Sequence, residues 1–116
     1  MANLRSQDQL SHGFRLTVRC HGPRALLAAS GDLDFASAGE LDRALVTQIR
    51  SGDLVVLDLR EIAFIDASGL SVVLRAAVMA HAAGTKLTLM SGECVRRMME
   101  HSGGEVPVLD QGPSPN

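Results

Sequence analysis

The chain has 116 residues, of which 46% are hydrophobic and 21% are charged, and its formal net charge is -2. This length is typical of one domain, and the composition is that of an ordinary globular protein rather than a disordered or membrane-spanning one. The basic residues are scattered, and the aromatic residues are three phenylalanines with no Trp or Tyr. Neither a basic stripe nor a base-stacking surface is evident, and we expect no binding to nucleic acid.

The two cysteines bear on metal and cofactor binding, and the N-terminal residues bear on the cellular location of the protein. Cys20 and Cys94 lie far apart and lack the spacing of metal ligands, which predicts free, buried or half-buried thiols, no metal site and no cofactor. Residues 1–10 are polar and lack the apolar core of a signal peptide, and no apolar stretch of about 18 residues follows. We therefore expect a cytoplasmic protein that does not bind a membrane.

The first half of the chain predicts a hairpin, a helix and a buried strand. Residues 14–20 alternate apolar and polar, and a second short apolar run at 24–30 follows a turn, which predicts an antiparallel β-hairpin. Apolar residues at helical spacing predict an amphipathic helix over 36–50. The almost wholly apolar run 54–59 is typical of a central strand buried on both faces.

The second half continues the alternation of strands and helices. We expect residues 60–66 to link the central strand to a helix over 68–83, which ends at Gly84. A strand over 86–90, a helix over 92–101 and a short strand over 106–109 are expected to follow. This order predicts an α/β fold with a single mixed sheet of four or five strands and with helices packed mainly on one face. The predicted domain covers 13–109, between a flexible N-terminal segment, 1–12, and a flexible tail, 110–116.

The turn that precedes the second helix is the most specific feature of the sequence. Asp66 and Ser68 stand directly before the helix, where either side chain can cap the first backbone N–H groups. A serine hydroxyl here is also accessible to solvent, and the helix dipole and unpaired N–H groups would favour a phosphate on it. That phosphate would add about -1.5 to -2 charge beside Asp66 and would repel a docked partner. The capping role and the switch role both remain open at this point.

The helix after this turn is apolar around most of its circumference. Beyond Ser68, its polar residues are Ser71, Arg75 and His81. Such a helix is either deeply covered by the rest of the fold or shared with a partner protein.

Several segments, in this order, resemble the STAS domain, and specifically the anti-sigma-factor antagonists of bacteria. They are Gly31-Asp-Leu-Asp34 before a helix rich in small residues, Val55-Val-Leu-Asp-Leu59, Phe64-Ile-Asp-Ala-Ser-Gly-Leu70, and the run 82–89. The resemblance covers about residues 14–109. Two departures stand out, since Ala67 replaces the first serine that the family often has, and Ser71 replaces a second glycine.

The resemblance implies a non-enzymatic, phosphorylation-controlled function. In the family, the serine before the glycine is phosphorylated by an anti-sigma factor that is also a Ser/Thr protein kinase, and this position is Ser68. The unphosphorylated chain would bind that kinase and release its sigma factor, and a Ser/Thr phosphatase would restore this form. The implied partner-binding residues are Asp34, Asp66, Ala67, Ser68, Gly69, Ser71 and Val72.

Some roles stay open beside this resemblance. Asp34 is equally well explained as a helix cap. Ser71 lies one helical turn from Ser68 and is either a second phosphorylation site or a solvated helix residue. A homo-oligomer is also left open.

The residues also bear on three other functions. The segment 53–60 resembles the phosphoacceptor strand of response-regulator receivers, with Asp58 as the acceptor, but an acidic pair after the first strand and a lysine at the end of a later strand are missing. A hydrolase that uses Ser68 lacks the Gly-x-Ser-x-Gly motif. A STAS module that serves as a scaffold without a phosphorylation cycle is the more serious alternative, and the retained Ser68 argues against it.

Overall fold

The computed structural model describes residues 5–11, 13–101 and 110–111, with side chains described for 13–101. The elements in chain order are β1 (Arg5–Ser11), β2 (Phe14–His21), β3 (Arg24–Leu33), α1 (Ala38–Ser51), β4 (Leu54–Ile65), α2 (Ala67–Ala83), β5 (Lys86–Ser91), α3 (Glu93–His101) and β6 (Asp110–Gln111). One sheet has the strand order β1-β2-β3-β4-β5-β6. The first two pairings are antiparallel and the last three are parallel, which confirms the predicted single mixed sheet.

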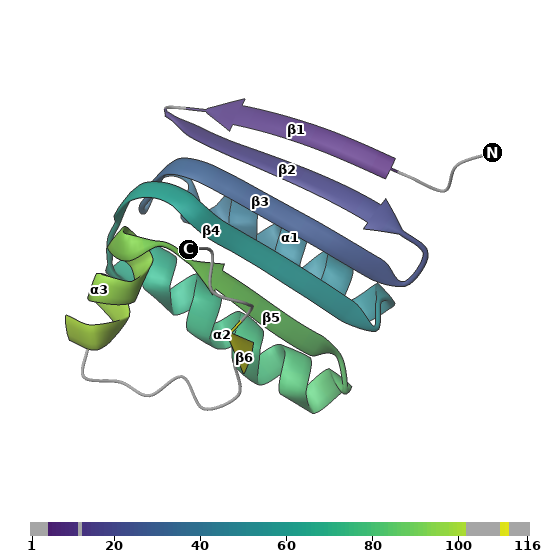
Figure 1. Ribbon diagram of the computed structural model, residues 1–116. Helices are drawn as coiled ribbons and strands as arrows, with labels where there is room; N and C mark the ends of the chain where they lie inside the picture. The colour runs from purple at the N-terminus through teal and green to yellow at the C-terminus, as the bar shows by residue number, and fades with distance from the viewer. Residues whose placement is uncertain (1–4, 12, 102–109, 112–116) are drawn as a thin grey trace.

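The strand order explains why the two long helices share one face. From β3 through β4 to β5 the chain steps across the sheet in one direction, through α1 and then α2. Because such crossovers between parallel strands are right-handed, both helices must cover the same face. Figure 1 shows α1 and α2 side by side behind the sheet, as predicted, with α3 at the carboxyl-terminal end of β5.

The core lies between this face and the two long helices. The inward side chains of β2 to β5 alternate with outward ones, and the largest fully buried residues include Phe14, Leu27, Leu57, Leu89, Leu41, Leu45, Ile49 and Val73. We predicted that β4 is buried on both faces, but only the side chains that face the helices are fully buried. Val55 and Leu57 are fully buried, whereas Val56, on the opposite face, is half-buried. The reason is that the second face of the sheet has no covering helix over the middle of β4 in the described ranges.

The prediction of a linking segment at 60–66 is wrong. β4 continues to Ile65, because its second half pairs with β3 after a register irregularity, with Gly31 opposite Ile62 and Leu33 opposite Ile65. Both isoleucines are buried, so pairing and burial together extend the strand.

The two edge strands bring the sheet to six strands rather than four or five. β1 lies within the segment 1–12 that we expected to be flexible, and it pairs with residues 14–20 of β2. β6 lies within the expected tail and pairs with Thr88 and Leu89 of β5. The strand predicted at 106–109 falls outside the described residues.

The second helix ends where the sequence predicted. Gly84 has a φ of 75°, in the left-handed region, and its N–H donates to the carbonyl groups of Ala80 and His81. Glycine adopts this conformation without the steric cost that a side chain brings. No helix in the described part of the chain combines the length and the apolar character needed to span a bilayer.

A buried threonine ties the end of α1 to the start of β5. The Thr85 hydroxyl donates to the carbonyl oxygens of Ile49, at 2.8 Å, and Gly52, at 3.1 Å, and the residue is buried. We predict that Thr85→Val lowers the free energy of unfolding by about 1–3 kcal/mol, because it leaves buried carbonyl groups without a donor. Urea denaturation measures the change. The control Thr47→Val, in which an exposed hydroxyl bonded only to the Arg43 carbonyl is lost, should change stability by less than about 0.5 kcal/mol.

Candidate functional site

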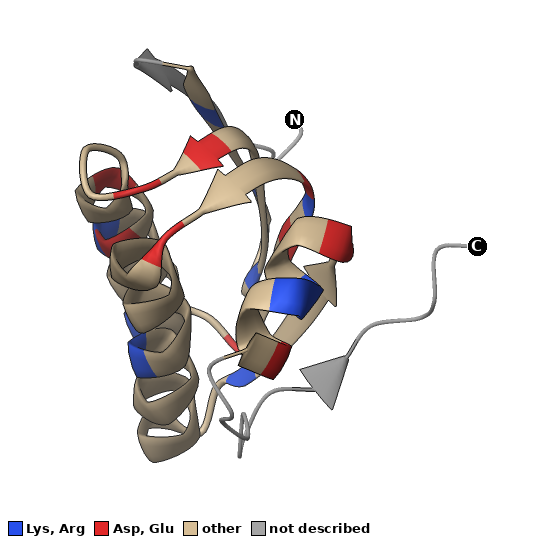
Figure 2. Cartoon of the chain, turned by 90° about the vertical axis from the view of Figure 1, so that its left-hand side faces the viewer, with Lys and Arg blue, Asp and Glu red and all other residues tan. Residues whose placement is uncertain are grey.

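The candidate site lies where the parallel strands β3 and β4 end and the helices α1 and α2 begin. Figure 2 looks onto this end and shows acidic residues at the ends of both strands and at the start of α1. The carboxyl ends of adjacent parallel strands meet at one edge of a sheet, so two loops far apart in sequence lie side by side here.

The carboxylate of Asp66 joins these two loops. Its Oδ1 atom accepts hydrogen bonds from the backbone N–H groups of Ser68, at 2.8 Å, and Gly69, at 3.1 Å, and so caps α2. Its Oδ2 atom accepts from the N–H of Phe35, in the loop before α1, at 3.2 Å. The N–H of Asp66 donates to the carbonyl of Leu33 at 3.2 Å. The capping interpretation of Asp66 is therefore confirmed, and the cap also holds the neighbouring loop.

Gly69 allows α2 to approach β3 closely. A Cβ atom at this position would stand 2.6 Å from the carbonyl oxygen of Leu33 and 3.1 Å from the side chain of Ile65. Both distances are shorter than ordinary contacts, so the first turn of α2 can occupy this place only with glycine. This packing sets the position of Ser68 relative to the loop before α1.

Asp34 organises the loop before α1. Its carboxylate accepts from the N–H groups of Ala36, at 3.0 Å, and Ser37, at 3.2 Å. The buried hydroxyl of Ser37 donates to the carbonyl of Asp32 and accepts from the N–H of Asp34. These bonds hold the loop and do not cap α1, whose N-cap residue is Ser37, so the helix-cap interpretation of Asp34 is wrong. Ser37 is a supporting residue that the sequence did not indicate.

Unlike Asp34, Ser37 and Asp66, Ser68 has a side chain that takes no part in the hydrogen bonds of the two loops. The residue is partly exposed, and within the described part of the chain its side chain makes no hydrogen bond. The N–H groups of Ser68 and Gly69 are already occupied by Asp66, so they are not the unpaired donors that we expected a phosphate to find. A phosphate on Ser68 would instead stand next to the Asp66 carboxylate.

The remaining predicted site residues divide between the surface and the core. Ala67 and Ser71 are exposed on the first turns of α2. Gly69 is buried, and Val72 is only 3% exposed and belongs to the core. Val72 therefore does not present its side chain to a partner, because at this point α2 turns that side toward the sheet. The larger apolar residues of α2 other than Val78 are buried or half-buried, so its apolar character chiefly reflects covering by the fold.

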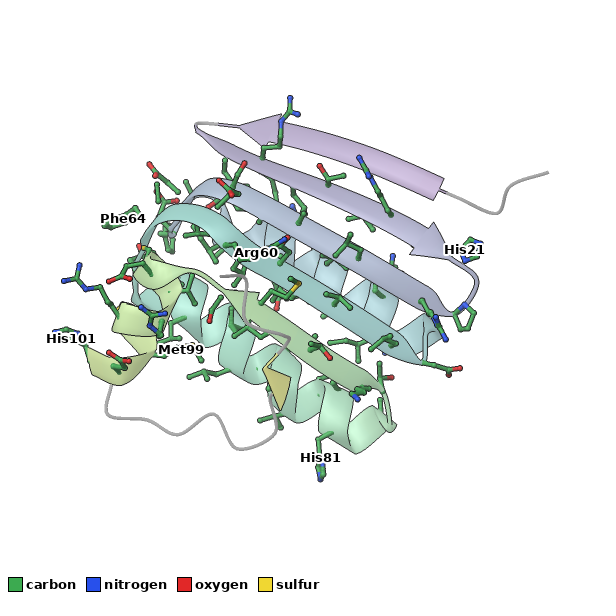
Figure 3. All side chains as sticks on the ribbon, in the orientation of Figure 1. His21, Arg60, Phe64, His81, Met99 and His101 are labelled. Carbon is green, nitrogen blue, oxygen red and sulfur yellow. The ribbon has the colours of Figure 1, made fainter. Side chains whose placement is uncertain are left out.

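The loop before α1 carries an exposed aromatic residue that the sequence did not indicate as part of the site. Phe35 is 84% exposed, and its backbone N–H donates to the Asp66 carboxylate. Phe64, near the end of β4, is 50% exposed and points outward at the same end of the molecule (Figure 3). The third phenylalanine, Phe14, is fully buried. An apolar residue directly after the Gly-Asp-Leu-Asp segment was the available signal for Phe35.

The structure does not place Asp58 where a receiver needs its phosphoacceptor. Asp58 lies in the middle of β4, which continues to Ile65, rather than at the end of a strand. Its carboxylate accepts two hydrogen bonds from the Arg60 guanidinium, at 3.0 and 2.9 Å, and these bonds lower the pKa of Asp58 below its ordinary value. A carboxylate bound in this way is a poor acceptor for phosphate.

The two cysteines are half-buried free thiols, as predicted. The Sγ atom of Cys20 donates to the Gln48 side chain at 3.3 Å. Within 5–11, 13–101 and 110–111, no group of three or more His, Cys, Asp or Glu residues is placed to hold a metal ion.

The close approach at Gly69 can be tested with two alanine substitutions. We predict that Gly69→Ala lowers the free energy of unfolding by about 1–3 kcal/mol, since the new methyl group meets the Leu33 backbone. Gly39→Ala is the matched control in α1, because its methyl group would meet only the flexible Arg43 side chain, at 3.4 Å. That substitution should raise stability by about 0.5–1 kcal/mol. Urea denaturation of both variants gives the comparison, and equal effects would contradict the packing argument.

Comparisons with known proteins agree with this architecture. A model of the STAS domain family matches residues 15–105. An anti-sigma factor antagonist from Mycobacterium paratuberculosis is 20% identical, with a TM-score of 0.75 over 91% of this chain and 92% of that chain. The Bacillus cell fate determinant SpoIIAA in its phosphorylated form is 15% identical, with a TM-score of 0.63 over 94% and 92%. The murine anion transporter Slc26a9 is 13% identical, with a TM-score of 0.64 over 98% of this chain but 21% of that chain.

None of the curated proteins compared with the chain matches it. At these identities the solved structures establish a common fold, while the family model covers most of the chain. The family assignment therefore rests on the sequence match to that model, and the shared fold agrees with it. The chain belongs to the STAS domain family.

Proposed function

We propose that this protein is an anti-sigma factor antagonist that phosphorylation of Ser68 switches off. In the unphosphorylated form it binds an anti-sigma factor that has Ser/Thr kinase activity, and this binding releases the sigma factor. A Ser/Thr phosphatase returns the phosphorylated protein to its binding form. The protein itself catalyses no reaction in this scheme.

The observation that carries the proposal is the hydroxyl of Ser68. It is partly exposed, is not engaged by any described side chain or backbone group, and stands on a helix terminus that Asp66 and Gly69 hold in place. A hydroxyl that the fold does not use can be modified without breaking a native hydrogen bond. The likeness in fold to anti-sigma factor antagonists supports the same function.

The surroundings of Ser68 explain how a phosphate would act. The surface already carries the carboxylates of Asp34 and Asp66, and a phosphate adds about -1.5 to -2 further charge there. A partner group that packs directly on Ser68 would have to remove water from this dense charge, which is costly. The switch thus works through desolvation and repulsion, and it needs no rearrangement of the fold.

Phe35 is the natural anchor for the partner. Aromatic side chains that enter a partner's pocket commonly supply much of the binding energy in protein interfaces. The backbone N–H of Phe35 donates to Asp66, which also caps the helix that carries Ser68. This shared carboxylate fixes the backbone of Phe35 relative to Ser68. A single interface would therefore sense both residues.

The switch can be tested with Ser68 variants as bait in pull-downs from the native cytoplasm, followed by mass spectrometry and titration of the purified partner. We expect wild type and Ser68→Ala to capture a kinase-type anti-sigma factor, and Ser68→Asp to bind it at least about tenfold more weakly. Ser51→Asp, at the far end of α1, is the charge-matched control and should bind like wild type. If Ser68→Asp and Ser68→Ala bind one partner equally, the chain is a scaffold module without a phosphorylation cycle.

Phe35→Ala tests the anchor with the same captured partner. We predict a loss of at least about tenfold in affinity, since the ring would leave its pocket empty. The free energy of unfolding should change by less than about 0.5 kcal/mol, because the ring is largely exposed. Val78→Ala removes an apolar side chain that is 62% exposed elsewhere on α2, and it should leave the affinity unchanged. Equal losses in both variants would mean that Phe35 has no special role.

A further inference from the structure

The face of the sheet opposite α1 and α2 forms a second surface. We call it the open face, and its described side chains come from alternate positions of β2 to β5. They are Arg15, Thr17, Arg19, Arg24, Leu26, Ala28, Ser30, Leu54, Val56, Asp58, Arg60, Lys86, Thr88 and Met90. Figure 1 shows this face toward the viewer, without a described helix over its middle, and Figure 3 shows Arg60 upon it.

The centre of the open face is apolar. The strand registers place Leu26 beside Val56, and they place Leu54 and Ala28 in the rows on either side. In the row of Ala28, Asp58 of β4 stands between Ala28 and Met90 of β5, and the Arg60 guanidinium pairs with its carboxylate. A sheet face that meets only water normally carries polar side chains between its buried ones. Here Leu26 is 38% exposed and its apolar neighbours are partly exposed. Exposed apolar side chains that lie together are typical of a surface that binds another molecule.

The rim of the open face is basic. Its cations are Arg15, Arg19, Arg24 and Lys86, and Arg60 adds a cation on the central strand β4. The described acidic residues nearby are Asp58, which is bound to Arg60, Asp53, whose carbonyl accepts from the Lys86 N–H, and Glu61 beyond the register irregularity. The cations still outnumber these carboxylates on this face. This surface therefore has the opposite charge to the acidic end that carries Ser68, although the whole chain has a net charge of -2.

Charge and shape together limit what can cover this face. Two open faces of the same kind would bring their arginines together, so a symmetric contact between copies is repulsive. Nucleic acid would find no aromatic side chain for stacking among the described residues of this face. Neighbouring apolar side chains on β3 and β4, with cations around them, match the apolar stripe and acidic flanks of an amphipathic helix.

We propose that the open face binds an acidic amphipathic helix of a partner protein. The helix lays its apolar stripe along Leu26, Val56 and the adjacent apolar residues, and its carboxylates meet the basic rim. This contact gives the sheet a helical layer on its second face. It is separate from the Ser68 surface, so both partners can bind at once.

A synthetic peptide provides the probe. The peptide has about 18 residues, or about 27 Å of helix, with a leucine stripe and glutamates on both flanks. Its matched control carries lysine in place of every glutamate. We expect saturable binding of the acidic peptide, measured by fluorescence anisotropy, and amide shift changes in NMR spectra that map to β2–β5. The lysine peptide should not bind.

Two pairs of charge reversals locate the site. Arg19→Glu with Arg24→Glu, on the rim, should weaken the acidic peptide at least about tenfold. Arg43→Glu with Arg50→Glu, exposed on α1 away from this face, should weaken it less than about twofold. Ser68→Asp should leave peptide binding unchanged, which separates this proposal from the proposed switch.

Several outcomes would overturn the proposal. These are absence of saturable binding, equal binding of the lysine peptide, equal weakening by both pairs of reversals, or shift changes centred on α3 or on the Ser68 turn. Sedimentation that shows a dimer dispersed by Leu26→Gln would assign the face to a second copy of the chain. Binding of anionic phospholipid vesicles that the rim reversals abolish, without peptide binding, would assign it to a membrane surface.

Discussion

The architecture of the candidate site depends on one carboxylate, that of Asp66. It receives the first N–H groups of α2 and the N–H of Phe35, a residue 31 positions earlier in the chain. A cap that served α2 alone would leave the loop before α1 unattached at this point. Because one side chain serves both, the position of Ser68 and the position of Phe35 are linked.

Close packing supports this hydrogen-bonded link. Gly69 lets the first turn of α2 lie against the backbone of β3, and Ser37 is buried beneath the loop before α1. The Asp66 carboxylate and the Ser37 hydroxyl thus have structural uses near Ser68, whereas the Ser68 hydroxyl has none in the described residues. A modification at that hydroxyl changes charge and hydration at the surface and leaves the supporting contacts intact. This division agrees with the proposed switch, in which the domain remains folded in both states.

The sheet separates two surfaces of opposite charge. The ends of β3 and β4 present carboxylates around Ser68, and the open face presents arginines around an apolar centre. Charges of one sign gathered on one surface select partners of the other sign and raise their rate of encounter. A chain with a small net charge can therefore still offer two selective surfaces, provided that its fold sorts the charged residues spatially.

The sequence by itself determined the α/β class, the hairpin, the helices, the helix end at Gly84 and the turn that carries Ser68. These features follow from local periodicity and from residues with strong conformational preferences. Only the tertiary structure decided that β4 continues to Ile65, that Val72 is buried, and that Phe35 lies beside Asp66. Each depends on which strands become neighbours and which face the helices cover. Those outcomes arise from pairing and crossover handedness between distant segments, which local periodicity does not encode.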